Sequence, residues 1–273
     1  MAFNKSRYFM KIGVTAITGK MGRTIASLVH QDAIAELCTG LVRQNSGNEN
    51  IDLGEMLGFE KINKFTTSDI NNFLSQCQAV IDFSTPALSL EIAKNCAINK
   101  KILICGTTGF SDSEKQIFAQ YAKETVIIWS ANMSLGVNLL MNLVEKVAGI
   151  LHEDFDVEIV EMHHNLKIDA PSGTSLSLGS AVAKGRNNDL EKIARLQRIG
   201  KDAKRIKGEI GFASLRGGDV IGDHTVIFAG NGERLELTHK ASNRDIFAKG
   251  AIRAAIWGSA QNPGFYSMRD VLN

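Results

Sequence analysis

The sequence has few cysteines, little net charge and no long apolar run, and each absence excludes a class of protein. The four cysteines among its 273 residues form no C-x-x-C pair and lie in apolar segments, so we expect buried thiols in a reducing cytosol. They are Cys38, Cys77, Cys96 and Cys105. The 31 basic and 29 acidic side chains leave a formal net charge of +2, which provides no strong field for nucleic acid.

Membrane insertion and repetitive architecture are not expected either. No stretch approaches the roughly 20 apolar residues needed to cross a bilayer, which predicts a cytoplasmic protein. Repeats and low-complexity tracts are missing, and the one charge-rich stretch, residues 201–207, is predicted to be a solvated loop. With 44% hydrophobic and 22% charged residues, the chain is typical of a soluble globular protein long enough for two domains.

What the chain does have is a dense group of chemically unlike residues in EMHHNLKIDAPSGT, residues 161–174. Residues 156–162 alternate between apolar and polar faces, which predicts a strand, so His163 and His164 lie where that strand ends. The pattern from Leu176 onward is helical, and the Pro-Ser-Gly-Thr sequence just ahead of it is typical of a helix start.

The start of this helix is predicted to attract an anion. Gly173 and Thr174 belong to its N-terminus, where backbone N–H groups and the positive end of the helix dipole favour phosphate or carboxylate. Lys167 can add a full positive charge. Asp169 can orient Lys167 or cap the helix.

This segment resembles the signature of the 4-hydroxy-tetrahydrodipicolinate reductase family, also called dihydrodipicolinate reductases, of the diaminopimelate route to lysine. The family pattern is E-x-H-H-x-x-K-x-D-A-P-S-G-T. Each specified position is matched here, at Glu161, His163, His164, Lys167, Asp169, Ala170, Pro171, Ser172, Gly173 and Thr174. A string that fixes unlike residues at set spacings is far more specific than a glycine pattern.

The N-terminal half reads independently as a nucleotide-binding domain. An apolar run at residues 10–17 leads into a TGKMGR turn and then a helical pattern, the context that a dinucleotide fingerprint requires. The G-x-x-G-x-x-G spacing of the family has its first glycine where this chain has Ala16, followed by Gly19 and Gly22. The effect of that methyl group on cofactor affinity stays open. The residues predicted to bind the cofactor here are Ala16, Ile17, Thr18, Gly19, Lys20 and Met21.

The end of the predicted second strand, residues 35–42, bears on the choice of cofactor. Family members that use NADH well carry an acidic residue at the position of Val42, and valine cannot accept hydrogen bonds from the ribose hydroxyls. Arg43 and Lys20 can bind a 2′-phosphate by charge-assisted hydrogen bonds. We therefore predict that NADPH is preferred and NADH possible, the alternative being that Arg43 is simply solvated.

Three further apolar runs, residues 79–83, 101–105 and 125–129, are typical of buried parallel strands separated by helices. Ligands in such sheets gather beyond the carboxyl ends of the strands. The GTTGF and SANMSLGVN segments also resemble this family. The resemblance implies that the nicotinamide half of the cofactor is lined by Gly106, Thr107, Thr108, Ser130, Ala131, Asn132 and Met133.

The second half changes character. A helix over residues 137–151 precedes the 156–162 strand, and three strand-like runs, 208–215, 219–229 and 233–241, follow with glycine turns between them, which predicts a chain of hairpins. We expect an α/β protein with a Rossmann-like parallel-sheet domain, residues 1–134 with 243–273, and an α+β domain with a mixed or antiparallel sheet, residues 135–242. The resemblance implies that the second domain binds substrate and assembles a homotetramer.

The resemblance also implies the chemistry. The substrate would be a cyclic imine dicarboxylate, 4-hydroxy-tetrahydrodipicolinate, reduced by hydride to tetrahydrodipicolinate with loss of water. Its two carboxylates need cationic or backbone N–H partners, which His164, Lys167 and the Gly173-Thr174 helix start can supply. His163 and Lys167 are candidate general acids, and the sequence leaves open which of them delivers the proton.

Three alternatives remain at this stage. Adjacent histidines with Glu161 or Asp169 can bind zinc, but no H-E-x-x-H spacing is present and neighbouring strand residues point to opposite faces, so no metal is predicted. His152, His224 and His239 lack such neighbours and are interpreted as structural. A rival enzyme is a two-domain relative of aspartate or homoserine dehydrogenase, and a rival class is a noncatalytic NADPH-binding sensor of a metabolite.

Overall fold

The computed structural model describes residues 9–201 and 203–273, which divide into two compact units. The first unit comprises Met1–Ser134 with Asp245–Asn273, and the second is Leu135–Arg244. The chain thus leaves the first unit once and returns to it. Among the helices of the described residues, none is both long and apolar enough to cross a membrane.

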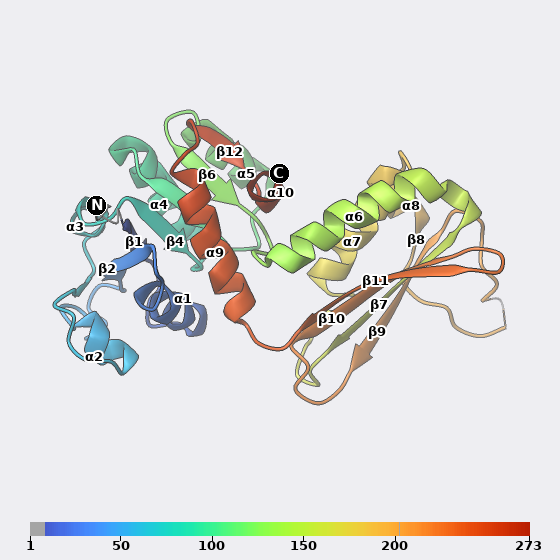
Figure 1. Ribbon diagram of the computed structural model, residues 1–273, viewed down its shortest axis with the longest axis horizontal. Helices are drawn as coiled ribbons and strands as arrows, with labels where there is room; N and C mark the ends of the chain where they lie inside the picture. The colour runs from blue at the N-terminus through green and yellow to red at the C-terminus, as the bar shows by residue number, and fades with distance from the viewer. Residues whose placement is uncertain (1–8, 202) are drawn as a thin grey trace, which may run out of the picture. The chain divides into compact units, whose positions relative to one another are not determined.

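The first unit is built on a seven-stranded parallel sheet in the order β12-β6-β5-β4-β1-β2-β3 (Figure 1). Its strands are β1 (Met10–Val14), β2 (Ala35–Leu41), β3 (Thr66–Thr67), β4 (Ala79–Asp82), β5 (Ile102–Cys105), β6 (Val126–Trp129) and β12 (Gly264–Tyr266). The expected Rossmann-like parallel sheet is confirmed. β1 ends three residues earlier than predicted because the chain turns at Thr15. The strands β3 and β12 were not predicted, because they are very short and contain no apolar run.

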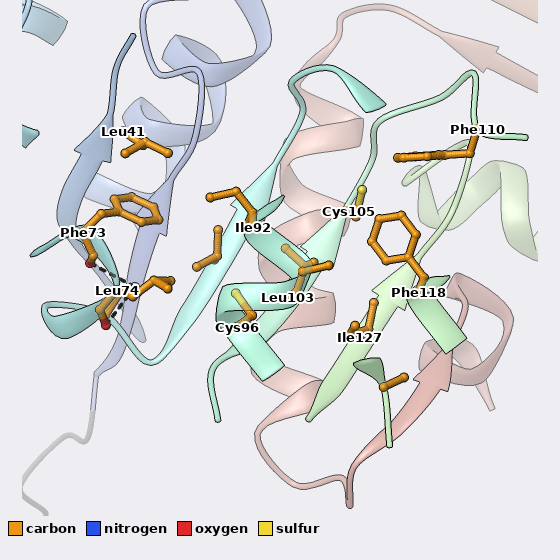
Figure 2. Packing of buried hydrophobic residues seen from close by; sticks show 14 residues of the cluster. Leu41, Phe73, Leu74, Ile92, Cys96, Leu103, Cys105, Phe110, Phe118 and Ile127 are labelled. Carbon is orange, nitrogen blue, oxygen red and sulfur yellow. Dashed lines mark hydrogen bonds between the residues drawn. The ribbon is translucent and has the colours of Figure 1, made fainter. Parts of the chain in front are cut away.

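Helices cover both faces of this sheet. They are α1 (Lys20–His30), α2 (Leu53–Leu57), α3 (Ile70–Ser75), α4 (Pro86–Asn99), α5 (Asp112–Tyr121), α9 (Asp245–Gly258) and α10 (Met268–Leu272). Figure 2 shows one core, to which Phe73 of α3, Ile92 of α4, Phe118 of α5 and Leu103 of β5 all belong. α9 packs on the other face, where a Cβ on Gly258 would lie 3.2 Å from Ile102.

All four cysteine thiols are buried and unpaired, as expected. Three of them, Cys77, Cys96 and Cys105, belong to the core of Figure 2. Burial raises the pKa of the Cys77 thiol to about 12, so the sulfur stays protonated and acts as an apolar packing group.

The second unit contains a mixed five-stranded sheet in the order β11-β10-β7-β9-β8. Its strands are β7 (Asp156–His163), β8 (Ala194–Arg195), β9 (Ile210–Arg216), β10 (Gly222–Ala229) and β11 (Arg234–Ala241). The central strand β7 runs antiparallel to β10 and parallel to β9. A mixed sheet was one of the two arrangements predicted.

The predicted chain of hairpins is wrong for its first pair of strands. β9 and β10 lie on opposite sides of β7, and only β10 and β11 form a hairpin. The connection between β9 and β10 crosses the end of β7 and is bonded to it through the backbone. The Gly217 N–H donates to the His163 carbonyl at 2.9 Å, and the His164 N–H donates to the Val220 carbonyl at 2.7 Å. These bonds hold the glycine-rich stretch open and prevent a tight turn.

Two helices, α6 (Leu135–Leu151) and α7 (Gly173–Gly185), cover one face of this sheet (Figure 1). Leu140 of α6 and Leu178 of α7 join Ile159 and Phe228 in a single core. The helices approach each other closely at Gly185, where an added Cβ would lie 2.2 Å from the Glu145 carbonyl oxygen. A short 3-10 turn (His152–Asp154) and α8 (Leu190–Ile193) complete the unit.

The described residues of the charge-rich stretch, 201 and 203–207, form a loop, as predicted, but the loop is not simply solvated. Asp202 lies outside the described residues. Arg205 is only 19% exposed, forms an ion pair with Glu158 and donates to the Val157 carbonyl at 3.1 Å. This arginine attaches the loop to β7, which the local sequence could not show because Glu158 and Val157 lie more than 40 positions away.

Candidate functional site

In the first unit, the turn between β1 and α1 has the geometry of an anion-binding loop. Helix α1 begins at Lys20, and Gly19 at its N-cap forms no side-chain capping bond, so the first N–H groups of the helix point out of the turn. Ala16 adopts a φ of +45°, the left-handed region that favours glycine. Gly22 is required by close approach, because a Cβ there would lie 2.3 Å from the Ala16 carbonyl oxygen.

A cavity of about 720 Å³ opens beside this turn. It is lined by Ala16 and Thr18 of the turn, Val42 and Arg43 after β2, and Ser84 after β4, among others. Val42 is 6% exposed, whereas Arg43 is exposed. These positions surround the switch point of the sheet, where β1 is flanked by β2 on one side and by β4 on the other, the place at which α/β sheets bind nucleotides.

Several of the predicted cofactor residues have buried side chains. Ile17 is 0% exposed, Thr107 5% and Met133 1%, so any contact that they make with a ligand must come largely from the main chain. Thr108, Lys20 and Ala131 are exposed. A second cavity of about 740 Å³ lies between α1 and α9, but no predicted site residue lines it.

In the second unit, the centre of the site is the carboxylate of Glu161. It lies on the buried face of β7 with 1% of its side chain exposed. Nη1 and Nη2 of Arg216 donate to its two oxygens, both at 2.9 Å, and the Ser172 N–H donates at 3.3 Å. Burial by itself raises the pKa of this carboxyl, but hydrogen bonds from Arg216, His163 and Ser214 outweigh it, so the pKa lies below its ordinary value.

His163 is oriented by that carboxylate. Its Nδ1 lies 2.5 Å from Glu161 Oε2, and because a carboxylate accepts, Nδ1 carries the hydrogen. His163 also contacts His224 of β10, with ring centroids 5.1 Å apart in an edge-on arrangement. His224 Nε2 lies 3.0 Å from the Ser172 hydroxyl, and burial, followed by the charge of His163, lowers the His224 pKa to about 4. His224 is therefore neutral near pH 7.

The segment after β7 positions Lys167. Its Nζ lies 2.7 Å from Asp169 Oδ1, and its side chain is 19% exposed. Arg216 Nη2 donates to the Asp169 carbonyl at 2.7 Å, so the same guanidinium holds both Glu161 and this segment. Asp169 orients Lys167, one of the two roles expected for it.

Helix α7 begins at Gly173, as predicted. Its N-cap is Ser172, whose hydroxyl accepts from the Ser175 N–H at 3.1 Å, so the expectation that Asp169 could cap this helix is wrong. Gly173 is exposed, and a Cβ there would meet no atom within 4 Å. The start of the helix therefore opens onto space that a ligand can enter.

Two members of this cluster, Arg216 and His224, were missed by local sequence patterns. Arg216 lies opposite His163 in the β7–β9 register, and His224 lies opposite Glu161 in the β7–β10 register. Only the pairing of strands could have found them. His224, interpreted from sequence as an ordinary structural residue, contacts His163 directly. Within residues 9–201 and 203–273, no three His, Cys, Asp or Glu side chains are placed to hold a metal ion.

The two units together define a class of protein. A parallel sheet with a glycine turn at its switch point is the architecture of a dinucleotide-binding unit, and a separate unit groups a histidine, a lysine and a helix N-terminus, which suit an anion. These are the parts of an oxidoreductase that uses NAD(P)H.

Comparison with known proteins identifies the family. The model of the dihydrodipicolinate reductase N-terminus matches residues 10–133, and that of the C-terminus matches residues 136–272. The 4-hydroxy-tetrahydrodipicolinate reductases of Bartonella tribocorum and Roseobacter denitrificans are 47% and 45% identical over 264 residues, spanning 96% of this chain and 98% and 97% of theirs. The chain therefore belongs to the dihydrodipicolinate reductase family.

A solved structure has the same fold. The dipicolinate-bound dihydrodipicolinate reductase from Paenisporosarcina sp. TG-14 superposes with a TM-score of 0.76 at 24% identity, covering 97% of this chain and 100% of that one. Membership of the family excludes the rival prediction of an aspartate or homoserine dehydrogenase relative. The predicted oxidoreductase is confirmed.

Proposed function

We propose that this protein reduces 4-hydroxy-tetrahydrodipicolinate to tetrahydrodipicolinate, with loss of water, in the diaminopimelate route to lysine. The observation that carries this proposal is the arrangement around the end of β7, in a chain matched by the family along nearly its whole length. Glu161 accepts from His163 and from the Ser172 N–H just before α7, and Asp169 in the same segment pairs with Lys167. Relatives with 45–47% identity carry the name of this activity.

The substrate carboxylates bind in the second unit. Dipicolinate, an aromatic dicarboxylate, occupies the Paenisporosarcina enzyme. In this chain the start of α7 at Gly173 and Thr174 offers backbone N–H groups and the positive end of a helix dipole, and Lys167 and His164 add polar side chains nearby. An anion with two carboxylates can thus be held at two points, which fixes its orientation.

The proton is supplied by His163 or Lys167. Hydride addition to a conjugated imine leaves an electron-rich atom that must be protonated, and the cofactor provides only the hydride. Glu161 accepts a hydrogen bond from Nδ1 of His163 and so orients its ring, while Asp169 holds the ammonium group of Lys167 at 2.7 Å. Each donor is thus oriented by its own carboxylate.

NADPH is the preferred cofactor. The cavity beside the glycine turn has no acidic side chain at Val42, where the hydroxyls of an NADH ribose would need an acceptor, and it has the cation of Arg43. Charge-assisted hydrogen bonds to a 2′-phosphate contribute about 1.5–3 kcal/mol each, which corresponds to roughly tenfold or more in affinity. Arg43→Ala is expected to weaken NADPH binding by that factor and to leave NADH binding unchanged.

Assembly into a homotetramer uses the second unit. The sheet face opposite α6 and α7 carries apolar side chains, among them Val160, Leu215 and Ile227, and Leu215 is 49% exposed. We expect Ile227→Lys to reduce the molar mass measured by light scattering on a sizing column. The matched control is Ile98→Lys, which changes a 66% exposed isoleucine in the first unit and should leave the mass unchanged.

The deciding assay generates the labile substrate in place. A synthase makes it from pyruvate and aspartate semialdehyde while absorbance at the nicotinamide band is followed with NADPH and NADH in parallel. Oxidation that requires both synthase substrates establishes the reductase, and faster oxidation of NADPH at low concentration supports the role of Arg43. If neither cofactor is oxidised, the noncatalytic metabolite sensor becomes the better description.

A further inference from the structure

A buried carboxylate, Asp82, lies at the middle of the sheet edge that is formed by the carboxyl ends of the parallel strands in the first unit. It is the last residue of β4, is 0% exposed, and lies between the ends of β5 and β1 in the sheet order. The motif that identifies the family does not include it. Neither the glycine turn nor the segments expected to bind nicotinamide contain it.

Asp82 collects hydrogen bonds from segments that are far apart in sequence. Five side chains donate to its two oxygens: Thr15, Ser84, Ser89, Cys105 and Thr107. Thr15 follows β1, Ser84 follows β4 and Thr107 follows β5, so the turns after three neighbouring strands of the sheet converge on one carboxylate. The Ser84 hydroxyl lies 2.6 Å from Oδ1, and the Thr107 hydroxyl lies 3.2 Å from Oδ2.

Thr107 shows how firmly these turns are joined. Its hydroxyl donates to Asp82 and also accepts from the Ser84 N–H at 2.9 Å, while its carbonyl accepts from Trp129 Nε1 at 3.0 Å. The side chain is 5% exposed. Its polar groups are therefore directed into the protein, and they fix the path of the Gly106–Thr108 backbone.

We propose that Asp82 is a positioning residue for the cofactor: its carboxylate sets the relative positions of the turns after β1, β4 and β5, which together bind the dinucleotide. This inference rests on the proposed function, since it assumes that these turns bind NADPH. Asp82 itself does not touch the cofactor, because its side chain is fully buried.

A carboxylate suits this place for a simple reason. A hydroxyl has one proton to donate, and a carboxylate can accept from about four directions, so one group satisfies several hydroxyls at once. An asparagine would turn two N–H donors toward groups that are themselves donors. Burial, with the nearby Asp82 charge, raises the pKa of the Cys105 thiol well above its ordinary value, so the sulfur keeps its proton and can also donate.

Asp82→Asn in the full-length protein is the first test, with NADPH affinity measured directly by fluorescence titration. We expect binding to weaken by about tenfold or more, while turnover at saturating NADPH and the KM for the dicarboxylate change by less than about threefold, because only uniform cofactor binding is lost. A folded Asp82→Asn protein with unchanged NADPH affinity would overturn the proposal and leave Asp82 a stability residue.

A second set of variants keeps the test decisive if Asp82→Asn does not fold. Thr107→Val keeps the shape of the side chain and removes its hydroxyl, whereas Thr107→Ser keeps the hydroxyl. We expect the valine variant to lose NADPH affinity and the serine variant to retain more of it. Ser89→Ala is the matched control, because Ser89 also donates to Asp82 but lies within helix α4 and not in one of the three turns. Equal affinities for the Thr107 variants would contradict the proposal.

Binding and turnover separate this inference from the function on which it rests. A wild-type protein that binds NADPH but does not oxidise it in the coupled assay would refute the reductase activity, and the ranking of affinities among the variants would still decide the role of Asp82. A wild-type protein that binds neither NADPH nor NADH would overturn both.

Discussion

Replacing Arg216 with methionine removes the counter-charge of a buried carboxylate. Nη1 and Nη2 of Arg216 each lie 2.9 Å from an oxygen of Glu161. The side chain of Glu161 is 1% exposed and that of Arg216 is 22% exposed. The loss in the free energy of unfolding can be estimated in two ways. Two charge-assisted hydrogen bonds contribute about 1.5–3 kcal/mol each, and breaking a buried ion pair costs about 3–5 kcal/mol. We expect Arg216→Met to lower the free energy of unfolding of the second unit by about 3 kcal/mol.

Urea denaturation followed by two probes can locate this loss. Both tryptophans, Trp129 and Trp257, belong to the first unit, so their fluorescence reports on that unit, whereas far-UV circular dichroism reports on both. The matched control is Arg234→Met, which breaks a 2.7 Å pair with Glu236 in the same unit. Because that pair is 64% and 45% exposed, about 0.5 kcal/mol or less is expected.

The stability contributed by the Glu161–Arg216 pair depends on pH in a definite direction. The pKa of Glu161 is lower in the folded state than its ordinary value of 4.5, so the stability that it contributes is fully present above pH 4.5 and is lost as pH falls through the folded pKa. The difference in the free energy of unfolding between wild type and Arg216→Met should therefore become smaller under acid conditions. An Arg216→Met protein within about 1 kcal/mol of wild type at pH 7 would refute the assignment of Glu161 as a buried, Arg-paired carboxylate.

Three further changes test other parts of the structure. Lys167→Ala should lower turnover by about 10²-fold or more if Lys167 is the general acid, and near-normal turnover would remove it from that role. Ala16→Gly should stabilise the first unit by about 0.5–1 kcal/mol in a tryptophan-monitored melt, because relief of the positive φ, worth about 1–2 kcal/mol, exceeds the extra chain entropy of glycine. The folded-state pKa of His224, about 4, lies below its ordinary value of 6.5, so the unfolded state binds more protons between these pH values. The free energy of unfolding of the wild type should therefore fall by up to about 3 kcal/mol as pH drops from 6.5 to 4. His224→Gln should remove this contribution to the pH dependence of stability. Parallel denaturation curves for wild type and His224→Gln over that range would contradict this reasoning.

Local patterns were sufficient where a structure depends on neighbouring residues. The alternation over residues 156–162 correctly predicted β7, since every second side chain enters the core. The Pro-Ser-Gly-Thr stretch correctly placed the start of α7, because capping uses residues adjacent in sequence. The apolar runs of the first half correctly gave five of the seven strands of its parallel sheet.

Contacts between distant segments could not be predicted in the same way. The parallel pairing of β9 with β7 depends on backbone hydrogen bonds at the end of β7, which no local pattern encodes. Arg205 was expected to be solvated because its partners Glu158 and Val157 lie on β7, far from it in the sequence. Residues such as Arg216 show no periodicity that marks them as members of a site.

The sequence by itself determined the family, five strands of the parallel sheet and the candidate groups for chemistry, because a motif of unlike residues at fixed spacing and an apolar run are local properties. Tertiary structure alone decided which groups act together. It joined Glu161 to Arg216 and His163 to His224 across strands, and gathered the turns after β1, β4 and β5 on Asp82. The physical reason is that a buried charge must find its partners in space, and strand register, rather than separation along the chain, determines which partners are near.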